Sequence, residues 1–428
     1  MPFCRAPQQF LLDLARAGRP VEAYRLDTDR FASVSHPDLA HAVLHGSQDD
    51  FEKGPLYDVI RPVFGNGILT AEREDWRGQH AAVAPMFARH RIRRLADSAM
   101  VLAARQVQRW DTLGGANDAG VLVATQRLAF DVVATGLLSL HDADRRGALF
   151  QVFNRVDRLP LVATHYLARS LPLDRLSAIV HRGETSTAAT LERLDQLLLE
   201  IADERLTATV QPDDVLGALL AGEYLAGLPE ARRRVVVRDL TSSLLTAGYA
   251  STGESMFWAL HLLARHPEVQ ARARAEVLAS GGPATDAPPY LAAVLNETLR
   301  LYPPAWYIGR TTRRAIVIGD AELAAGTQVV CSPYVIHRMP SVWADPDRFR
   351  PERFLPGATI VPRSFIPFGS GPRACVGRTL ALMEMSALVS SALVAFDIDV
   401  DGPDPVPLGP TYSLQPREPI AFRFRPRS

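Results

Sequence analysis

The segment FGSGPRACVG at 368–377 constrains this chain more than any other, because it places one cysteine directly before a predicted helix over 376–396. Unpaired N–H groups and the positive dipole end at a helix N-terminus favour a thiolate, which predicts a lowered pKa for Cys375. Gly371 and Gly377 lack a Cβ and let the backbone approach a flat partner. Arg373 supplies a permanent cation that suits a carboxylate. Together these features suit a haem iron bound by the cysteine, with a propionate beside the arginine.

Five positions follow the pattern F-x-x-G-x-R-x-C-x-G: Phe368, Gly371, Arg373, Cys375 and Gly377. The pattern resembles the haem-binding signature of the cytochrome P-450 family, the haem-thiolate monooxygenases. The resemblance implies haem b (iron protoporphyrin IX) with the cysteine as axial ligand and only metal ligand. It also implies one domain over residues 1–428, mainly α with a small β region, with a long central helix over the haem.

Composition agrees with a large globular enzyme. The chain has 428 residues, 47% of them hydrophobic, and its 47 basic residues balance 47 acidic ones. A zero net charge argues against a nucleic-acid binder. Three scattered cysteines (Cys4, Cys331 and Cys375) indicate a reducing compartment. Lys53 is the only lysine, which is typical of a GC-rich bacterial genome.

No targeting or membrane segment is predicted. Residues 1–20 include the charged Asp13, Arg16 and Arg19 and only short apolar runs, unlike a signal peptide. A transmembrane helix needs about 18 apolar residues without charges, and the sequence contains no such stretch. We therefore expect a cytoplasmic protein without a membrane anchor, and a monomer.

Apolar spacings of three and four residues predict helices over most of the chain. The expected ranges are 91–110, 121–140, 186–206, 234–265, 267–279, 290–301 and 376–396. The 234–265 helix would be roughly 45 Å long, and Pro267 should end it. Strands are expected in two regions, 21–35 and 313–336.

Three charged residues are expected to form a buried network. Glu297 and Arg300 form an E-x-x-R pair on one face of a predicted helix, and Arg353 lies in PERF at 351–354. In the resembled family these positions form a structural charge network below the haem. A structural role is also expected for His337.

Four residues are expected at the haem propionates by the same resemblance: Trp76, His80, Arg310 and Arg373. Trp76 and His80 are four residues apart and share a face if helical. The family usually has arginine at the position of His80, so a charge there would depend on pH near neutrality.

The helix residues LLTAGYASTGES at 244–255 resemble the oxygen-activating motif of the family but lack its acid, because Ala250 occupies that position. Ser251 and Thr252 retain hydroxyl groups for proton relay. Glu254, one turn beyond Ala250, is a candidate to replace the acid through water; the alternative is an ordinary helix charge or a member of an ion pair. Two alternatives stay open: the substrate supplies the acid, or the reaction needs less proton delivery, as in phenol coupling, desaturation or ring closure.

Position matching predicts a mainly apolar substrate pocket for a lipophilic molecule such as a terpenoid, polyketide or fatty acid. Its expected residues are Leu56, Tyr57, Ile60, Leu245, Ala247, Gly248, Tyr249, Ala305, Trp306, Tyr307, Thr411 and Tyr412.

The resemblance implies a monooxygenase that activates O₂ to hydroxylate, epoxidise, desaturate or couple a lipophilic small molecule of specialised metabolism. Its electrons would come from a separate ferredoxin or flavodoxin with its reductase. The basic run Arg89, Arg91, Arg93 and Arg94 is a candidate docking face for an acidic donor. Two other functions remain open. A peroxide-driven peroxygenase would explain the missing acid, and a non-catalytic haem protein would need neither electrons nor substrate.

Overall fold

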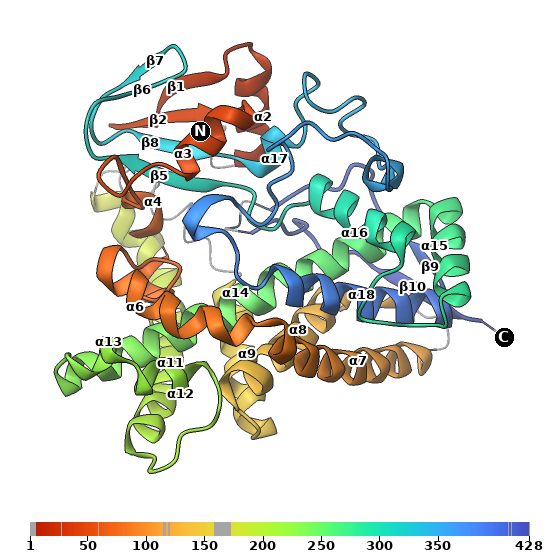
Figure 1. Ribbon diagram of the computed structural model, residues 1–428, viewed down its shortest axis with the longest axis horizontal. Helices are drawn as coiled ribbons and strands as arrows, with labels where there is room; N and C mark the ends of the chain where they lie inside the picture. Colours follow the sequence, from red (N-terminus) through yellow and green to blue (C-terminus); the bar gives the residue numbers. More distant parts are fainter. Residues whose placement is uncertain are drawn as a thin grey trace.

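The computed structural model describes residues 6–26, 28–58, 60–113, 117–118, 120–157, 173–409, 411 and 413–427. Helices form the larger part of the molecule, and a small group of strands lies at one corner (Figure 1). The predicted class, mainly α with a small β region, is confirmed.

Every predicted helix has a counterpart in the structure. The main helices are α6 (Arg73–Val83), α7 (Arg89–Asp111), α8 (Val121–Leu138), α9 (Ala143–Val156), α11 (Leu173–Thr207), α14 (Glu230–Arg265), α15 (Pro267–Ala279), α16 (Pro289–Leu301) and α18 (Arg378–Ala395). Shorter helices are α2 (Pro7–Arg16), α3 (Pro37–Leu44), α4 (Pro55–Asp58), α5 (Arg61–Phe64), α12 (Val215–Ala221), α13 (Glu223–Ala226) and α17 (Pro333–Ile336), with 3₁₀ turns η1 (Ala84–Phe87), η2 (Pro351–Phe354) and η3 (Gly371–Arg373).

The larger sheet has the strand order β1-β2-β8-β5-β3. Its strands are β1 (Val21–Leu26), β2 (Asp29–Val34), β3 (Phe51–Glu52), β5 (Ile308–Thr312) and β8 (Gln328–Cys331). Only β2 and β8 pair in parallel; the other neighbours are antiparallel. The hairpin of β6 (Ile316–Ile318) and β7 (Ala321–Leu323) lies beside it. Both predicted strand regions are therefore confirmed, although 333–336 is helical.

A second sheet was not predicted. It contains β4 (Asn117–Asp118), β10 (Phe422–Pro426) and β9 (Phe396–Val400) in that order. The segment FDIDV alternates buried and half-buried residues, but it directly follows α18, and the helical pattern hides where the helix ends. Its partner β10 lies more than twenty residues later, so the pairing depends on tertiary contacts.

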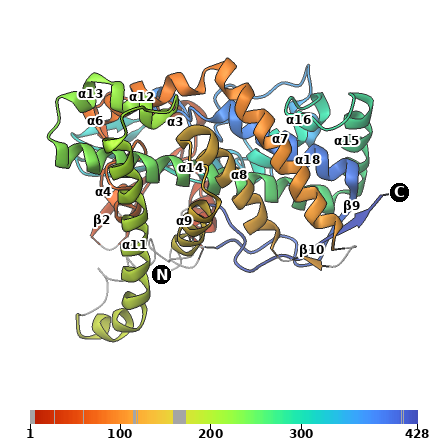
Figure 2. The same cartoon turned by 90° about the horizontal axis from the view of Figure 1, so that it is seen from below.

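Helix α14 is the centre of the helical part and runs across the molecule (Figure 2). Its 36 residues correspond to about 54 Å. Buried hydroxyl groups along it bond back within the helix: Thr241 donates to the Val237 carbonyl at 2.7 Å and Thr246 to the Ser242 carbonyl at 2.9 Å. These bonds explain how a helix with so many polar residues can be buried.

Two helices, α8 and α18, are long and apolar enough to cross a membrane by length and composition. However, 61% of the α8 window and 67% of the α18 window are buried inside the molecule. Each also carries an acidic and a basic residue. Their hydrophobicity is accounted for by core packing.

We predict opposite effects for alanine at two helical glycines. In α14, a Cβ on Gly253 would lie 2.5 Å from the Gln126 Cα of α8. Because backbone cannot move aside cheaply, Gly253→Ala should lower the free energy of unfolding by about 1–3 kcal/mol. In α9, a Cβ on Gly147 would lie 4.0 Å from an Arg127 side-chain nitrogen and meet no closer atom. Gly147→Ala should therefore raise the free energy of unfolding by up to about 1 kcal/mol.

Urea unfolding of the two variants beside wild type measures both effects. Equal stabilisation of both variants would show that α8 and α14 do not pack as closely as described.

Candidate functional site

The cysteine loop connects η3 to α18. The Cys375 N–H donates to the Phe368 carbonyl at 2.9 Å, which closes the loop. The thiol sulfur accepts hydrogen bonds from the N–H groups of Gly377 and Arg378 at the start of α18. The Cys375 side chain is exposed, so the sulfur combines two backbone donors with an open face.

The expected lowering of the thiol pKa is wrong for this structure. Desolvation by surrounding atoms raises the pKa of Cys375 and outweighs the two backbone hydrogen bonds and the Arg378 charge, which lower it. The helix terminus alone predicts a lowered pKa, but the protein atoms around the sulfur desolvate it even though one face of the residue is exposed. A bound metal ion would outweigh desolvation and lower the thiol pKa, because a thiol that coordinates a metal is deprotonated.

Gly371 fixes the approach of the loop to α3. Its φ of +79° lies in the left-handed region, and a Cβ there would lie 2.4 Å from the Leu44 carbonyl oxygen. Any other residue would be strained and would clash with backbone. Phe368 lies under the guanidinium of Arg378, whose carbon is 5.6 Å from the ring centroid.

Beside this loop lies a small, partly open pocket of about 50 Å³ that carries several charged groups. Lys53, Arg310 and Arg373 line it together with Glu72 and Trp76. The Arg373 guanidinium donates to Glu72 at 3.0 Å and lies 4.6 Å from the Trp76 ring. Arg310, on β5, is buried and donates to the Gly309 carbonyl at 2.8 Å.

Trp76 and His80 lie on α6 as expected, and their ring centroids are 4.8 Å apart. Trp76 lines the charged pocket. The structure therefore brings together Trp76, Arg310 and Arg373, with His80 stacked behind the tryptophan. Arg373 differs from expectation in one respect, since Glu72 already neutralises part of its charge.

Three charged residues of this pocket, Glu52, Lys53 and Glu72, belong to no recognised motif. The one available signal was that Lys53 is the only lysine in an arginine-rich chain.

These residues fit a haem group. A thiol with two backbone donors suits an axial thiolate, and Gly371 lets the loop pack directly against the end of α3. The pocket holds more cationic than anionic groups, which suits carboxylates. Cys375 would hold the iron, and Arg310, Arg373 and Trp76 would hold the propionates.

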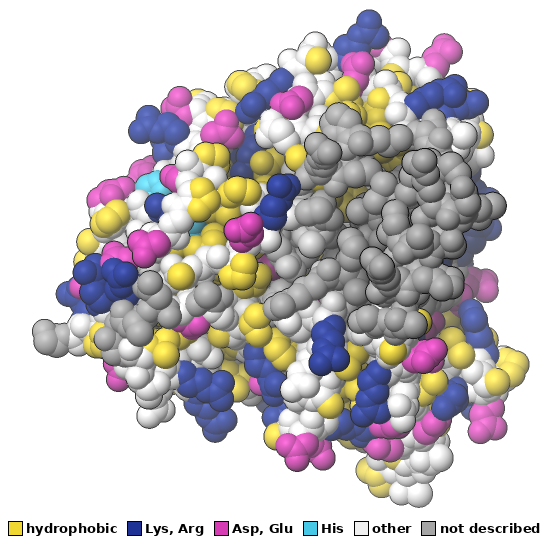
Figure 3. Space-filling view, turned by 180° about the vertical axis from the view of Figure 1, so that it is seen from behind, with side chains coloured by type: hydrophobic (Ala, Val, Ile, Leu, Met, Phe, Trp, Pro, Cys, Tyr) yellow, Lys and Arg dark blue, Asp and Glu magenta, His cyan; other side chains and the backbone are white. Residues whose placement is uncertain are grey.

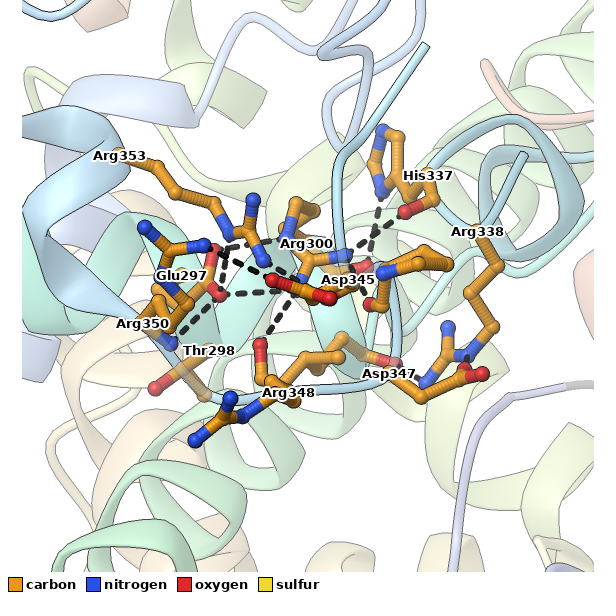
Figure 4. A network of polar contacts seen from close by, with 12 residues as sticks. Glu297, Thr298, Arg300, His337, Arg338, Asp345, Asp347, Arg348, Arg350 and Arg353 are labelled. Carbon is orange, nitrogen blue, oxygen red and sulfur yellow. Dashed lines mark hydrogen bonds and ion pairs between the residues drawn. The ribbon is translucent and has the colours of Figure 1, made fainter. Parts of the chain in front are cut away.

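The predicted charge network is assembled around Glu297 (Figure 4). Arg300 donates to its two carboxylate oxygens at 2.7 and 2.8 Å. Arg353 donates to Oε1 at 3.2 Å, as does the Arg350 N–H at 2.9 Å. Glu297 and Arg300 are both fully buried.

Arg300 also binds three carbonyl groups, which gives every one of its five N–H donors an acceptor. These carbonyls belong to His337 at 2.8 Å, Pro346 at 2.6 Å and Arg348 at 3.1 Å. His337 is buried, and its Nε2 accepts from the Ile366 N–H at 3.0 Å. The network thus extends from α16 to the segment that leads into the cysteine loop.

The oxygen-activating segment forms the middle of α14. Ala247, Gly248 and Ser251 are half-buried, whereas Thr252 is buried. The Ser251 hydroxyl donates to the Ala247 carbonyl at 2.7 Å. A Cβ on Gly248 would lie 2.4 Å from Val133 Cγ2, so close packing against α8 requires this glycine.

Glu254 is fully buried. Its Oε1 accepts from the Ser413 hydroxyl at 2.6 Å and from the Gln415 amide at 2.8 Å. Its Oε2 has no hydrogen-bond partner in the described part of the structure. Burial raises the pKa of Glu254 to about 8, and the nearby Asp157 charge adds to this effect. The carboxyl is therefore mostly protonated at neutral pH.

Two expected pocket residues lie elsewhere. Tyr249 is fully buried in a cluster with Phe130, Phe150 and Phe153, and its hydroxyl donates to Asp157. Leu245 is also fully buried in the main core. Both face away from Ala247 and Ser251, because position matching along the sequence did not account for helical rotation.

The remaining candidates for the substrate pocket differ in how far they are buried. Trp306 is buried and donates to the Thr411 carbonyl at 3.1 Å, and half-buried Tyr307 packs against it at 4.5 Å. Tyr57 and Ile60 are half-buried, and Ala305 is exposed. The Leu56 side chain, Tyr412 and Cys4 lie outside the described residues.

Only some of the arginines on α7 that were expected to contact an electron donor are exposed and without a described ion pair. Arg91 donates to Asp213 at 2.8 Å, while Arg93 and Arg94 are exposed; the Arg89 side chain is outside the described part. On the face shown in Figure 3, basic and acidic side chains are interspersed. The described residues on that face form no area dominated by one sign of charge.

Comparison with known proteins finds a matching family and related bacterial enzymes. The family model described as Cytochrome P450 matches residues 4–424. "Cyclooctatin synthase" of Streptomyces melanosporofaciens is 30% identical over 399 residues, covering 90% of this chain and 84% of the relative. "Cyclooctat-9-en-7-ol 5-monooxygenase" of the same organism is 29% identical, covering 91% and 85%.

Similarity extends to Mycobacterium and to solved structures. "Putative cytochrome P450 132" of Mycobacterium tuberculosis is 29% identical and covers 94% of this chain and 89% of its own length. The crystal structure of the "cytochrome P450DA heme domain" superposes with a TM-score of 0.83, covering 99% of this chain and 94% of that one. At 24% identity it supports the fold alone.

We predict that Glu297→Ala strongly destabilises the protein. It leaves the buried Arg300 charge without its carboxylate, a loss that typically costs about 3–5 kcal/mol. Urea unfolding of the variant and the wild type measures this loss of stability.

A matched control is Arg234→Met, which removes an exposed ion pair to Asp203 and should cost less than about 1 kcal/mol. Similar small losses in both variants would contradict the importance of the network.

Proposed function

Since the chain belongs to the cytochrome P450 family, we propose that Cys375 is the axial ligand of its haem iron and that its substrate is a lipophilic small molecule. As a member of this family the chain is a monooxygenase that binds iron protoporphyrin IX through a cysteine thiolate. The observation that carries the assignment of Cys375 is its open sulfur, which accepts two backbone hydrogen bonds at the start of α18.

Bound haem supplies the iron at which O₂ is activated. Around it, Arg310, Arg373 and Trp76 would orient the propionates, with His80 supporting the tryptophan. The N–H groups of Gly377 and Arg378 would offset part of the charge on the sulfur. Glu297, Arg300 and Arg353 would act at a distance, by holding the chain that leads to the cysteine loop.

Protons are proposed to pass through Ser251 and Glu254, with Thr252 as a second hydroxyl. Ala247, Ser251 and Glu254 are spaced i, i+4 and i+7, so they share one face of α14. Glu254 Oε1 already accepts two hydrogen bonds, which leaves Oε2 to carry the proton. With a pKa of about 8, this carboxyl can donate a proton near neutral pH, as the missing acid at Ala250 cannot.

The substrate class rests on the half-buried apolar and aromatic residues Tyr57, Ile60, Ala247 and Tyr307. One Streptomyces relative is named as a monooxygenase of cyclooctat-9-en-7-ol, a name that denotes an alkene alcohol. We infer oxidation of a compound of this lipophilic kind in specialised metabolism, in the cytoplasm.

Electrons are proposed to come from a separate ferredoxin or flavodoxin and its reductase. The exposed Arg93 and Arg94 are candidates for the contact. Product formation with a reduced ferredoxin but not with hydrogen peroxide supports this source. The opposite result would favour a peroxide-driven enzyme.

We predict that Cys375→Ala abolishes the thiolate signature. The reduced CO complex of the wild type should show the red-shifted main absorption band of a thiolate-bound haem, because the anionic sulfur donates charge to the iron. The variant should lose this band and most of its bound haem. Cys331→Ala is the matched control, since Cys331 is buried in the sheet core. An unaltered spectrum in Cys375→Ala would refute the proposed ligand.

We predict that Glu254→Gln lowers the product formed per electron consumed. Glutamine keeps the acceptor for Ser413 and Gln415 but cannot release a proton. The experiment measures NAD(P)H consumption against product, with the exposed Glu268→Gln as control. Unchanged coupling would remove Glu254 from the proton path.

A further inference from the structure

We propose that Ser413 and Gln415 are positioning residues for Glu254: their two hydrogen bonds occupy Oε1 of this carboxyl and confine its acidic proton to Oε2. The use of that proton rests on the proposed function, whereas the contacts themselves do not depend on haem. The inference adds two residues near the C-terminus that no motif of the sequence identified.

The three side chains form a closed group, although 159 residues separate Glu254 from Ser413 in the sequence. The Ser413 hydroxyl donates to Glu254 Oε1 at 2.6 Å, and the Gln415 amide donates to the same oxygen at 2.8 Å. The amide also donates to Ser413 Oγ at 3.4 Å. Because the amide supplies the hydrogen of that contact, the serine keeps its own hydrogen for the carboxyl.

Two donors on one oxygen decide where the proton of a neutral carboxyl resides. A carboxyl oxygen has two lone-pair sites, and the two donors take both sites of Oε1. An added proton therefore binds Oε2, which has no hydrogen-bond partner in the described part of the chain. Because Glu254 is fully buried, this O–H group is shielded from bulk solvent and can donate to a water molecule or a ligand inside the protein.

The turn that carries the two donors is held by contacts that do not use their side chains. Trp258 on α14 donates to the Leu414 carbonyl at 2.7 Å. The Thr411 hydroxyl donates to the Ser413 carbonyl at 2.6 Å. Loss of the Ser413 hydroxyl or the Gln415 amide therefore removes a donor from the carboxyl without releasing the backbone.

Hydrogen bonds are what stabilise the ionised form of Glu254. Burial and the charge of Asp157 raise the pKa of this carboxyl to about 8, while the Ser413 and Gln415 side chains and the Leu414 N–H oppose the rise. These main groups include no cation. The two side-chain donors therefore set how strong an acid Glu254 is.

The other titratable groups on α14 and on its packing partners also supply no positive charge here. Asp157, which follows α9, accepts from the Tyr249 hydroxyl. Glu384 on α18 is a second buried carboxyl whose pKa burial raises. His261, further along α14, is neutral because burial lowers its pKa to about 3. The α8 residue beside Gly253 is the uncharged Gln126.

Infrared titration of the haem-loaded protein tests the role of the two donors. The C=O stretching band of a protonated carboxyl that is absent from Glu254→Gln belongs to Glu254, and in wild type it should disappear around pH 8. Ser413→Ala and Gln415→Met each remove one donor from Oε1. Because the ionised form loses a charge-assisted hydrogen bond, the midpoint should rise by roughly one to two pH units. The band should also move to higher wavenumber, because its carbonyl oxygen accepts one bond fewer.

Two further variants separate this role from a structural one. Ser413→Thr keeps the hydroxyl and should restore the wild-type midpoint. Ser391→Ala is the matched control, since it removes another buried hydroxyl, which donates to the Ala387 carbonyl within α18 at 2.7 Å. This control should leave both the midpoint and the band of Glu254 unchanged.

Unshifted midpoints in Ser413→Ala and Gln415→Met would overturn the proposal. An equal shift in Ser391→Ala, or no recovery in Ser413→Thr, would overturn it as well. Should Ser413→Ala fail to fold, Gln415→Met decides the question, because this half-buried residue gives the second bond to the same oxygen.

Failure of the proposed function has a different signature. Unchanged coupling of electron consumption to product in Glu254→Gln would remove Glu254 from the proton path, but the infrared shifts would remain. With Glu254 in the path, the pH at which coupling falls should move upward in Ser413→Ala together with the infrared midpoint. A coupling profile that stays in place while the midpoint moves would contradict a positioning role in the reaction.

Discussion

The buried guanidinium of Arg300 is the interaction on which the rest of the structure depends. Its five donors are satisfied by Glu297 and by three carbonyl groups between 337 and 348. An unpaired charge in the core costs several kcal/mol. The chain segment 337–348, which supplies the three carbonyl groups, must therefore lie against α16 (Figure 4). His337 then holds Ile366, nine residues before Cys375. The position of the sulfur is thus determined by charges that never approach it.

The molecule contains two kinds of buried charge with different consequences. Around Arg300 every donor has a protein acceptor, so the group is complete and rigid. Around Lys53, Arg310 and Arg373 the pocket is lined by three basic and two acidic side chains, an arrangement that suits an anion. The first group stabilises the fold, and the second is the candidate site for carboxylates.

Sequence reasoning succeeded where a signal is local and failed where it is not. The helices follow from apolar periodicity, and the E-x-x-R pair follows from helical spacing. The second sheet was missed because its strands are short and pair across more than twenty residues. Tyr249 was expected in the substrate pocket, but the rotation of α14 places it in a buried aromatic cluster with Phe130. Lys53 was overlooked because its partners come from distant segments.

What the sequence determined by itself is the family, the helical framework and the cysteine loop, because spacing, helix termini and glycine positions are properties of adjacent residues. The tertiary structure decided the protonation of Glu254, the raised pKa of Cys375 and the excess positive charge around Lys53. These quantities depend on burial and on charges brought together from remote parts of the chain, and electrostatic energy is set by distance in space rather than along the sequence.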